Sequence, residues 1–290
     1  MANDIKKVGT FVPFLDEVYK EASLTTDLEG ANDLVRPGAN PGELVVPKIS
    51  MSGLADYDRA VGYETGDVTF DYETIKADYD RGIMFQVDNV DNEETANLAF
   101  GKLASEFVRT QVAPEQDAYR FAKYAGSNNI LKVTVPAALE TGEKVLSAIS
   151  DASAEMDENE VPPEGRILYI TSTLLRLARN VDKYKSKEIL DTFFKIKPVP
   201  QKRFYTAVTL NKNRSEGFGF KKASGAADIN FEIIHKSAAI QYQKHINTKI
   251  IPPELNQKAD AWIYGYRTVA ITQPYENKTK GIYLHHKVVS

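Results

Sequence analysis

The chain has 290 residues, with 36 Lys and Arg against 40 Asp and Glu, so its formal net charge is −4 at pH 7. Apolar residues make up 42% and charged residues 26%, which is ordinary globular composition and excludes the disordered class. We expect no membrane span and no signal peptide, because no apolar run has the length of either. The chain has no Cys, which excludes disulfides and thiolate metal sites. It also lacks the basic excess of proteins that grip nucleic acid through many phosphates.

The first 45 residues carry scattered turn formers and few periodic apolar positions. Phe11, Phe14, Leu15 and Val18 are spaced as in a helix. We therefore predict a short helix followed by an extended arm over residues 1–45. A strand over residues 44–49 follows, and its proline favours the edge of a sheet.

A long β-ribbon is predicted next, because apolar residues alternate with polar ones in two runs. These apolar positions are Val68, Phe70 and Tyr72, then Ile83, Phe85 and Val87. A period of two with polar residues between indicates strands with one buried face. Residues 77–82 between the runs are typical of a turn, so the two runs are predicted to form one ribbon.

One unusually long helix is predicted after the ribbon. Asp91 and Glu94 have the spacing of a reciprocal N-terminal cap. Apolar residues then recur at helical spacing, at Ala96, Phe100, Leu103, Phe107, Ala118, Phe121, Ala122 and Ala125. Pro114 has no amide for the carbonyl of Thr110, which predicts a kink or short break. The whole run of roughly 30 residues could reach about 50 Å.

The remaining residues predict alternating strands and helices. Strands are expected at residues 131–135, 166–170, 204–210, 231–235 and 239–244. A helix is indicated by the spacing of Val145, Ile149, Ala152 and Met156, and another by Leu174, Leu177 and Ala178. The first of these helices ends in the acidic residues Asp151, Glu155, Asp157, Glu158 and Glu160. This acidic end is either a solvated face or a charged rim between subunits.

Motifs for catalysis, cofactors or metals are missing. The four histidines are His235, His245, His285 and His286. The adjacent pair cannot share one face of a strand, and the others lack a ligand spacing, so structural roles are expected. No nucleophile elbow, phosphate-binding loop or dinucleotide fingerprint is present, and aromatic residues occupy the glycine-rich stretch 217–220. We predict no catalytic residue, no cofactor and no metal.

Several stretches of the sequence, taken together in order and spacing, resemble the major capsid protein of tailed bacteriophages. They are residues 80–88, 91–95 and 106–120 and, more loosely, 163–170, 235–239 and 281–283. The resemblance is to phages with long non-contractile tails that infect Gram-positive hosts. It implies an α+β chain of the HK97-type capsid fold, in which an extended loop precedes a long spine helix.

The resemblance also implies how the chain is divided and used. It places an N-terminal arm at residues 1–45, an extended β-hairpin loop at 46–90, a peripheral domain at 91–135 and 251–290, and an axial domain at 136–250. Copies would form the hexamers and pentamers of an icosahedral head, assembled in the host cytoplasm. The virion would enclose double-stranded DNA without sequence-specific binding. Separate portal and head-completion proteins are expected partners.

Scaffolding is expected from a separate protein or not at all. Some relatives begin with a scaffolding domain that is cleaved during maturation. In this chain, sequence similar to the family is under way within the first tens of residues. If Met1 is the true start, no such domain precedes it.

Cohesion of the shell is predicted to be non-covalent. In some relatives a lysine near the tip of the loop forms an isopeptide bond with a neighbour. Here residues 53–75 contain no lysine, and Arg59 near the tip stays protonated. Aromatic and charged residues are instead predicted to make the intersubunit interface: Tyr57, Asp58, Arg59, Tyr63, Glu64, Phe70, Tyr72, Tyr79, Asp80 and Arg81. The alternative is that half of the aromatic residues cover the subunit's own sheet.

Two other functions remain open at this point. An encapsulin-like nanocompartment has the same fold but holds cargo enzymes, so it would form a small protein-loaded particle rather than a DNA-filled one. A soluble cytoplasmic enzyme with an unrecognised site would be a monomer or small oligomer. Light scattering of the purified protein separates a shell subunit from such an enzyme.

Overall fold

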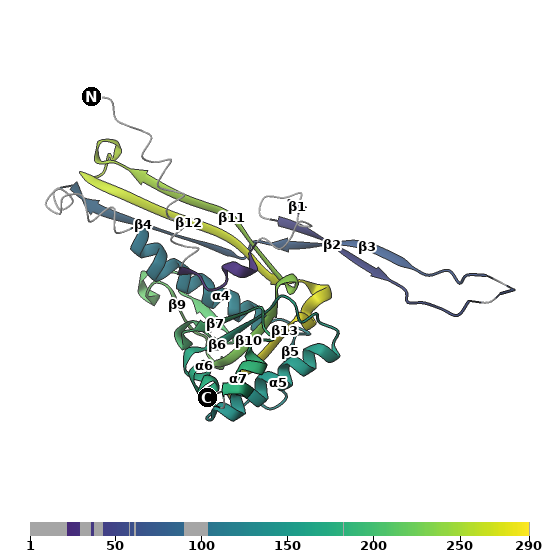
Figure 1. Cartoon of the computed structure of the whole chain (residues 1–290). Coiled ribbons are helices and arrows are strands. Elements are labelled where there is room, and N and C mark those ends of the chain that lie inside the picture. Colours follow the sequence, from purple (N-terminus) through teal and green to yellow (C-terminus); the bar gives the residue numbers. More distant parts are fainter. Residues whose placement is uncertain are drawn as a thin grey trace.

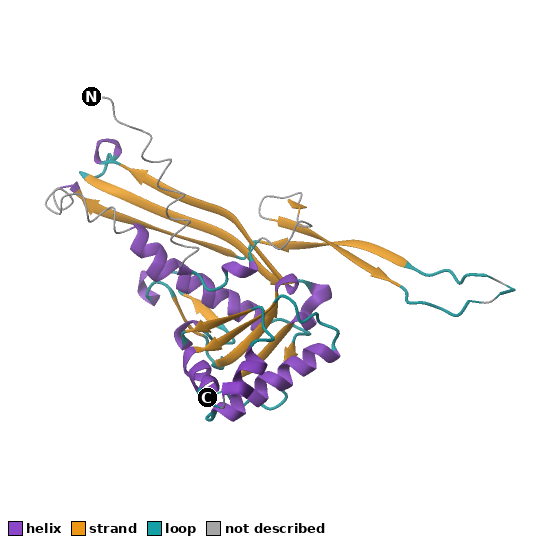
Figure 2. Cartoon of the chain, viewed as in Figure 1, coloured by secondary structure: helices purple, strands orange, loops and turns teal. Residues whose placement is uncertain are grey.

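The computed structural model describes residues 22–29, 36–37, 43–57, 59–60, 62–89, 104–181 and 183–289. A body of helices and sheets carries a two-stranded ribbon that projects far from it (Figure 1). A long three-stranded sheet runs along one side of the body, and a five-stranded sheet with helices fills the rest (Figure 2). The α+β fold class is therefore confirmed. No helix in these described ranges is long and apolar enough to cross a bilayer.

The five-stranded sheet forms the centre of the body. Its strands, in spatial order, are β5 (Leu131–Lys132), β13 (Ile282–His286), β10 (Ile229–His235), β6 (Arg166–Thr171) and β7 (Lys195–Val199). Every residue of β6 is buried. Such continuous burial is typical of a strand that is covered on both faces.

Two apolar cores lie on the two faces of this sheet. Leu168 and Ile170 face a core shared with the helices α5 (Gly142–Glu158), α6 (Ser172–Arg179) and α7 (Lys183–Leu190). Ile167 and Tyr169 face a second core shared with the helix α4 (Ala113–Ala125). Because successive side chains of β6 point to opposite faces of the sheet, the long helix packs on one face and the helices α5, α6 and α7 pack on the other.

The helix α5 confirms the prediction from its periodic residues. Val145, Ile149, Ala152 and Met156 are all buried. Thr141 caps the helix, because its side chain accepts a hydrogen bond from the amide of Lys144. The pattern was informative because α5 is amphipathic and packs on a single core.

Gly142 begins α5 at a point where the chain touches α6. A Cβ added there would lie 2.2 Å from the carbonyl oxygen of Leu177 and 2.3 Å from a methyl carbon of Val181. Gly142→Ala is therefore expected to lower the free energy of unfolding by about 1–3 kcal/mol, because one of the two helices must move. Urea denaturation measures this. Gly53→Ala is the control, because nothing lies within 4 Å of its Cβ position, and equal effects of the two substitutions would contradict the packing argument.

The long helix packs on a second sheet. This sheet consists of β11 (Ala239–Ile251), β12 (Ala261–Pro274) and β4 (Tyr79–Asp88), all antiparallel and in that order. Ala104, Val108 and Val112 of the helix are buried against Tyr264 and Tyr266 of β12. The helix thus connects the two sheets of the body.

The predicted break at Pro114 is present as a segment of π-helix, η2 (Val108–Val112), that directly precedes α4. The amide of Ala113 donates to the carbonyl of Val108, five residues earlier. The wider turn accommodates a proline that has no amide to donate. The predicted cap at Asp91 and the helical positions 96–103 lie outside the described residues.

The pairing of the ribbon differs from the prediction. β3 (Val68–Lys76) pairs with β2 (Glu43–Met51), whereas β4 pairs with β12 in the other sheet. The prediction that residues 68–72 and 83–87 form one ribbon is wrong. An alternation of apolar and polar residues identifies strands but does not select the strands with which they pair. The link between β3 and β4 connects two different sheets. The strand predicted over residues 44–49 is the true partner.

The division of the chain into a peripheral and an axial domain stays a prediction. The five-stranded sheet includes β5 and β13, and the three-stranded sheet includes β11. The predicted boundaries after residues 135 and 250 therefore separate strands that share a sheet. Local sequence patterns do not reveal this, because it depends on pairings between distant segments.

Shorter elements complete the described chain. They are η1 (Thr26–Leu28), β1 (Arg36–Pro37), η3 (Gln201–Arg203), β8 (Val208–Leu210), η4 (Arg214–Glu216), β9 (Phe220–Lys222), η5 (Lys236–Ala238), η6 (Pro253–Leu255) and η7 (Glu276–Gly281). β1 pairs with β2 at the base of the ribbon, and β8 pairs with β9.

Candidate assembly site

The outer part of the ribbon has one apolar face. In the antiparallel register Ile49 lies opposite Phe70, Met51 opposite Val68, and Pro47 opposite Tyr72. Residues that lie opposite each other share a face, and so do residues two apart along a strand. The six side chains therefore form a continuous apolar surface, which we call the apolar face.

The apolar face is uncovered in the single chain. Met51 is 70% exposed, Val68 73%, Phe70 54% and Tyr72 53%. The sequence pattern predicted a buried face for these residues, and within one chain they are exposed. An apolar surface of this kind on a two-stranded ribbon marks a site for a partner, because such a ribbon is marginally stable in water by itself.

The base of the ribbon is attached through its opposite face. Leu44, Val46 and Ile75 are buried and pack against Ile240 of β11 and Ile271 of β12. The buried side of the ribbon thus changes between its base and its outer part. The base belongs to the core of the chain, and the outer part is uncovered.

A set of polar contacts supports the ribbon where it leaves the body. The hydroxyl of Tyr275 donates to the carbonyl of Pro47 at 2.7 Å, and Lys48 forms an ion pair with Glu276. The side-chain amide of Gln273 donates to Glu73 at 2.9 Å. Burial, with Glu276 nearby, raises the pKa of Glu73. These contacts join both strands of the ribbon to β12 and η7, so they help to fix its direction.

The tip of the ribbon presents further aromatic residues. The rings of Tyr57 and Tyr63 meet edge to face, with centroids 4.8 Å apart, and both side chains are exposed. Arg59 and Glu64 are exposed beside them. Asp58 lies outside the described residues. The predicted interface residues of the tip are therefore accessible, and their role stays a prediction.

The three predicted interface residues on β4 are engaged within the chain. Tyr79 is only 1% exposed in the single chain, and its role at an interface stays a prediction. Asp80 forms a two-pronged ion pair with Arg267 of β12, at 3.0 and 2.6 Å. Arg81 is paired with Glu115. The cause is the pairing of β4 with β12, which places these side chains against the body instead of on the ribbon.

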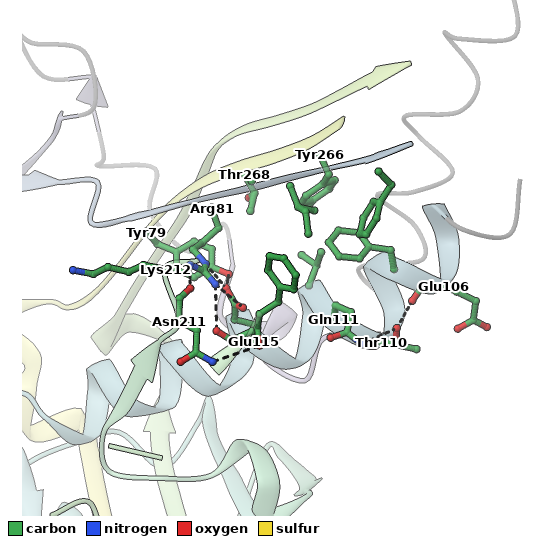
Figure 3. A pocket seen from close by; sticks show the side chains of 17 residues that line it. Tyr79, Arg81, Glu106, Thr110, Gln111, Glu115, Asn211, Lys212, Tyr266 and Thr268 are labelled. Atoms are coloured by element: carbon green, nitrogen blue, oxygen red, sulfur yellow. Dashed lines mark hydrogen bonds and ion pairs between the residues drawn. The ribbon is translucent and has the colours of Figure 1, made fainter. Parts of the chain in front are cut away.

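Arg81 is the centre of a junction between β4, α4 and the loop between β8 and β9 (Figure 3). It donates to both carboxylate oxygens of Glu115, at 2.6 and 3.1 Å, and to the carbonyls of Asn211 at 2.7 Å and Gly219 at 3.3 Å. The hydroxyl of Tyr79 donates to the same carboxylate at 3.1 Å. Glu115 raises the pKa of Arg81, so the guanidinium stays protonated.

The middle of the long helix holds the segment before η1 through a buried carboxylate. Asp117, fully buried, accepts hydrogen bonds from the hydroxyls of Ser23 and Thr25 at 2.7 and 2.8 Å, and from the amide of Leu24 at 2.9 Å. Arg120, also fully buried, donates to Thr25 and forms an ion pair with Glu29. The sequence analysis missed this network, because its partners are more than 90 residues apart in the chain.

Two of the histidines have clear structural roles. His285 is buried, stacks on Phe231, and accepts a hydrogen bond at Nδ1 from the side-chain amide of Asn230 at 3.0 Å. His235 contacts Ser237 and the carbonyl of Glu164. Within the described ranges, no group of three or more His, Asp or Glu side chains is arranged to hold a metal ion.

His285 gives the fold a pH dependence. Burial, with a smaller contribution from His286, lowers the pKa of His285 from 6.5 to about 4. Between these values the unfolded chain binds a proton that the folded chain excludes, so the free energy of unfolding falls as the pH falls. We expect a loss of about 3 kcal/mol between pH 6.5 and 4 from this residue.

His285→Gln should weaken the dependence of the free energy of unfolding on pH between pH 6.5 and 4. Urea denaturation at a series of pH values measures this. His286→Gln is the control, because His286 is partly exposed, hydrogen-bonds the carbonyl of Lys287 through Nδ1, and makes the smaller contribution to the pKa of His285. If His285→Gln leaves the pH profile of the parent unchanged, this explanation is wrong.

Comparison with known proteins shows the fold. No family model and no curated protein matches the sequence. A structure from Mycobacterium phage Che8 matches with a TM-score of 0.56 and 14% identity, over 83% of this chain and 84% of that chain. The capsid of cyanophage P-SCSP1u matches with a TM-score of 0.59 and 12% identity, over 93% and 89%. A virus-like particle from Pyrococcus furiosus matches with a TM-score of 0.58 and 10% identity, over 97% and 100%.

Each match covers more than four fifths of both chains, and identities this low show the fold alone. The projecting ribbon precedes the long helix in the chain, in the order that the resemblance in the sequence implied. The chain has the HK97-type fold of phage capsid proteins.

Proposed function

We propose that the chain is the major capsid protein of a tailed bacteriophage. Copies assemble into hexamers and pentamers of an icosahedral head that encloses double-stranded DNA, and the chain has no enzymatic activity. The observation that carries the proposal is the uncovered apolar face on a ribbon that is anchored at its base by a buried core. The similar folds of the cyanophage P-SCSP1u capsid and of a structure from phage Che8 support it.

Self-association through the ribbon follows from energetics. Burying one large apolar side chain is worth about 1.5–3 kcal/mol, so the apolar face offers a large part of the free energy that holds two copies together. Exposed ion pairs contribute about 0–1 kcal/mol each and mainly set the register. Aromatic residues such as Tyr57, Tyr63, Phe70 and Tyr72 are favoured anchors, because they bury much area for little loss of side-chain freedom.

Non-covalent cohesion is part of the proposal. The lysines that border the ribbon have partners in their own chain: Lys48 pairs with Glu276 and Lys76 with Glu43. Between them the sequence has no lysine to act as a nucleophile. Boiled particles should therefore run as a single band of 32.3 kDa in denaturing electrophoresis. A ladder of oligomers that survives boiling would contradict this part.

A second candidate is an encapsulin-like shell, which the likeness to the virus-like particle from Pyrococcus furiosus favours. The two candidates differ in what they enclose. Particles purified from phage-infected cells should contain nuclease-protected DNA if the chain is a phage capsid protein. Particles that contain only a second protein would favour the compartment instead.

A further inference from the structure

Glu232 is an acidic side chain in the middle of the five-stranded sheet. It lies on β10, opposite Tyr169 of β6 and Leu284 of β13 in the antiparallel register. Residues that lie opposite each other share a face of the sheet. Tyr169 and Leu284 both face the second core, on which α4 packs. Glu232 therefore points into the largely apolar layer between the sheet and the long helix.

The carboxyl group of Glu232 is enclosed without a partner. Its residue is 0% exposed, and neither carboxyl oxygen has a hydrogen-bond partner among the described residues. An ionised carboxyl group is very costly to bury in this way, so a group in such a place holds a proton instead. Burial raises the pKa of Glu232 well above its ordinary value of 4.5, in agreement with the geometry.

The charges around this core are neutralised without Glu232. The ion pairs are those of Arg120 with Glu29, Asp117 with Arg203, and Asp27 with Lys195 and Lys197. Leu284 on β13 and Gln241 on β11 do not titrate. Since burial is the one cause that shifts the pKa of Glu232, none of these basic side chains compensates a charge on it.

Two tyrosines share the second core with Glu232, Tyr124 of α4 and Tyr169 of β6. Burial is the main cause that raises the pKa of each, and Glu232 adds to the effect, which shows that it lies near both rings. Both hydroxyls therefore keep their protons at pH values where a buried carboxyl group ionises. A change of charge in this core with pH comes from Glu232.

We propose that Glu232 is a pH-sensitive switch in the packing of the long helix: the folded chain keeps it as a neutral carboxylic acid, and loss of its proton separates α4 from the sheet. Ionisation transfers one proton from the carboxyl group to water and leaves a carboxylate in a core that offers it no partner. The helix α4 covers this core, whereas α5 packs on the other face of the sheet, so α4 is the element that gives way. The switch belongs to the single chain and does not depend on assembly.

Glu232→Gln tests the switch, because the amide has nearly the shape of the protonated acid and cannot ionise. Above pH 4.5 the unfolded parent loses this proton while the folded parent keeps it, so the parent loses stability relative to the variant as the pH rises. The unfolding constant of the parent, divided by that of the variant, should rise about tenfold per pH unit from pH 4.5 up to the pKa of the folded chain. Urea denaturation measures the ratio, and the contribution of His285 cancels because both chains contain it.

The matched control is Glu158→Gln, which removes the same charge at an exposed position at the end of α5. The ratio of unfolding constants between parent and control should change by less than about twofold over the same pH range, because an exposed carboxylate is solvated in both states. A ratio for Glu232→Gln as constant as that of the control would overturn the proposal.

Hydrogen exchange of the unaltered chain gives a test that needs no variant. Protection factors, corrected for the intrinsic effect of pH, are compared between pH 7 and about pH 9. Protection of residues 116–125 in α4 should fall at least about tenfold, and further than that of residues 145–156 in α5, because ionisation acts on the face that α4 covers. Unchanged protection in α4, or an equal loss in the two helices, would contradict the switch.

Discussion

Asp117→Ala is expected to lower the free energy of unfolding by about 3–5 kcal/mol, the cost of breaking a buried charged network. The carboxylate accepts hydrogen bonds from Ser23, Leu24 and Thr25, and it lies 3.4 Å from a guanidinium nitrogen of Arg203. Removing it leaves these buried donors without an acceptor, which costs more than the loss of the bonds alone. Denaturation in urea measures the effect.

Glu106→Ala on the same helix is the control for Asp117→Ala. The ion pair of Glu106 with Arg109 is exposed on both sides, so its loss should cost less than about 0.5 kcal/mol. Hydrogen exchange should also show that residues 22–29 open in Asp117→Ala, because the helix no longer holds them. A loss below about 1 kcal/mol would mean that this network does not stabilise the fold as described.

Replacing residues 51–68 by an Asn-Gly turn is expected to abolish shell assembly while leaving a folded monomer. The change removes the tip and the outer end of the apolar face but keeps Leu44, Val46 and Ile75, which attach the ribbon to the core. Since the removed side chains are mostly exposed, the free energy of unfolding should change by less than about 1 kcal/mol. Light scattering and circular dichroism report assembly and folding separately.

A finer pair of variants locates the effect on one face of the ribbon. Phe70→Ser with Tyr72→Ser, both on the apolar face, should reduce the yield of particles at least about tenfold. Thr69→Ala, on the opposite face of the same strand, should leave the yield unchanged. If shells still form with residues 51–68 replaced, the ribbon does not join the copies and another surface must do so.

The sequence predicted the elements whose signals are local. The buried face of α5 followed from four residues at helical spacing, all of which are buried. The break before α4 followed from the missing amide of Pro114, and the structure accommodates it with a π-helical turn. In both cases the physical cause lies within a few residues of its effect, so that no knowledge of distant contacts was needed.

Features that depend on distant segments could not be predicted in this way. The alternation in residues 68–72 and 83–87 indicated strands, but the choice of β2 and β12 as partners depends on residues far away in the chain. Tyr79 was placed in the turn of a single ribbon because residues 68–72 and 83–87 were joined wrongly. Its burial follows from the pairing of β4 with β12 and from the contact with Glu115.

The candidate site was predicted in part. The exposed aromatic residues Tyr57, Tyr63, Phe70 and Tyr72 lie on the ribbon as the sequence indicated. The division of the ribbon into an attached base and an uncovered outer part was not predicted, because it requires the register of β2 and β3. The pocket beside Arg81 in Figure 3 was also missed, since its walls come from three separate parts of the chain.

The central claim is that ribbons join copies of this chain into a closed shell. Electron cryomicroscopy of particles formed by the expressed chain tests it most directly. We expect icosahedral shells of hexamers and pentamers, in which the ribbon of each copy lies on its neighbour with Phe70 and Tyr72 covered. A chain that remains monomeric, or shells in which the ribbon projects into solvent without touching another copy, would contradict the account.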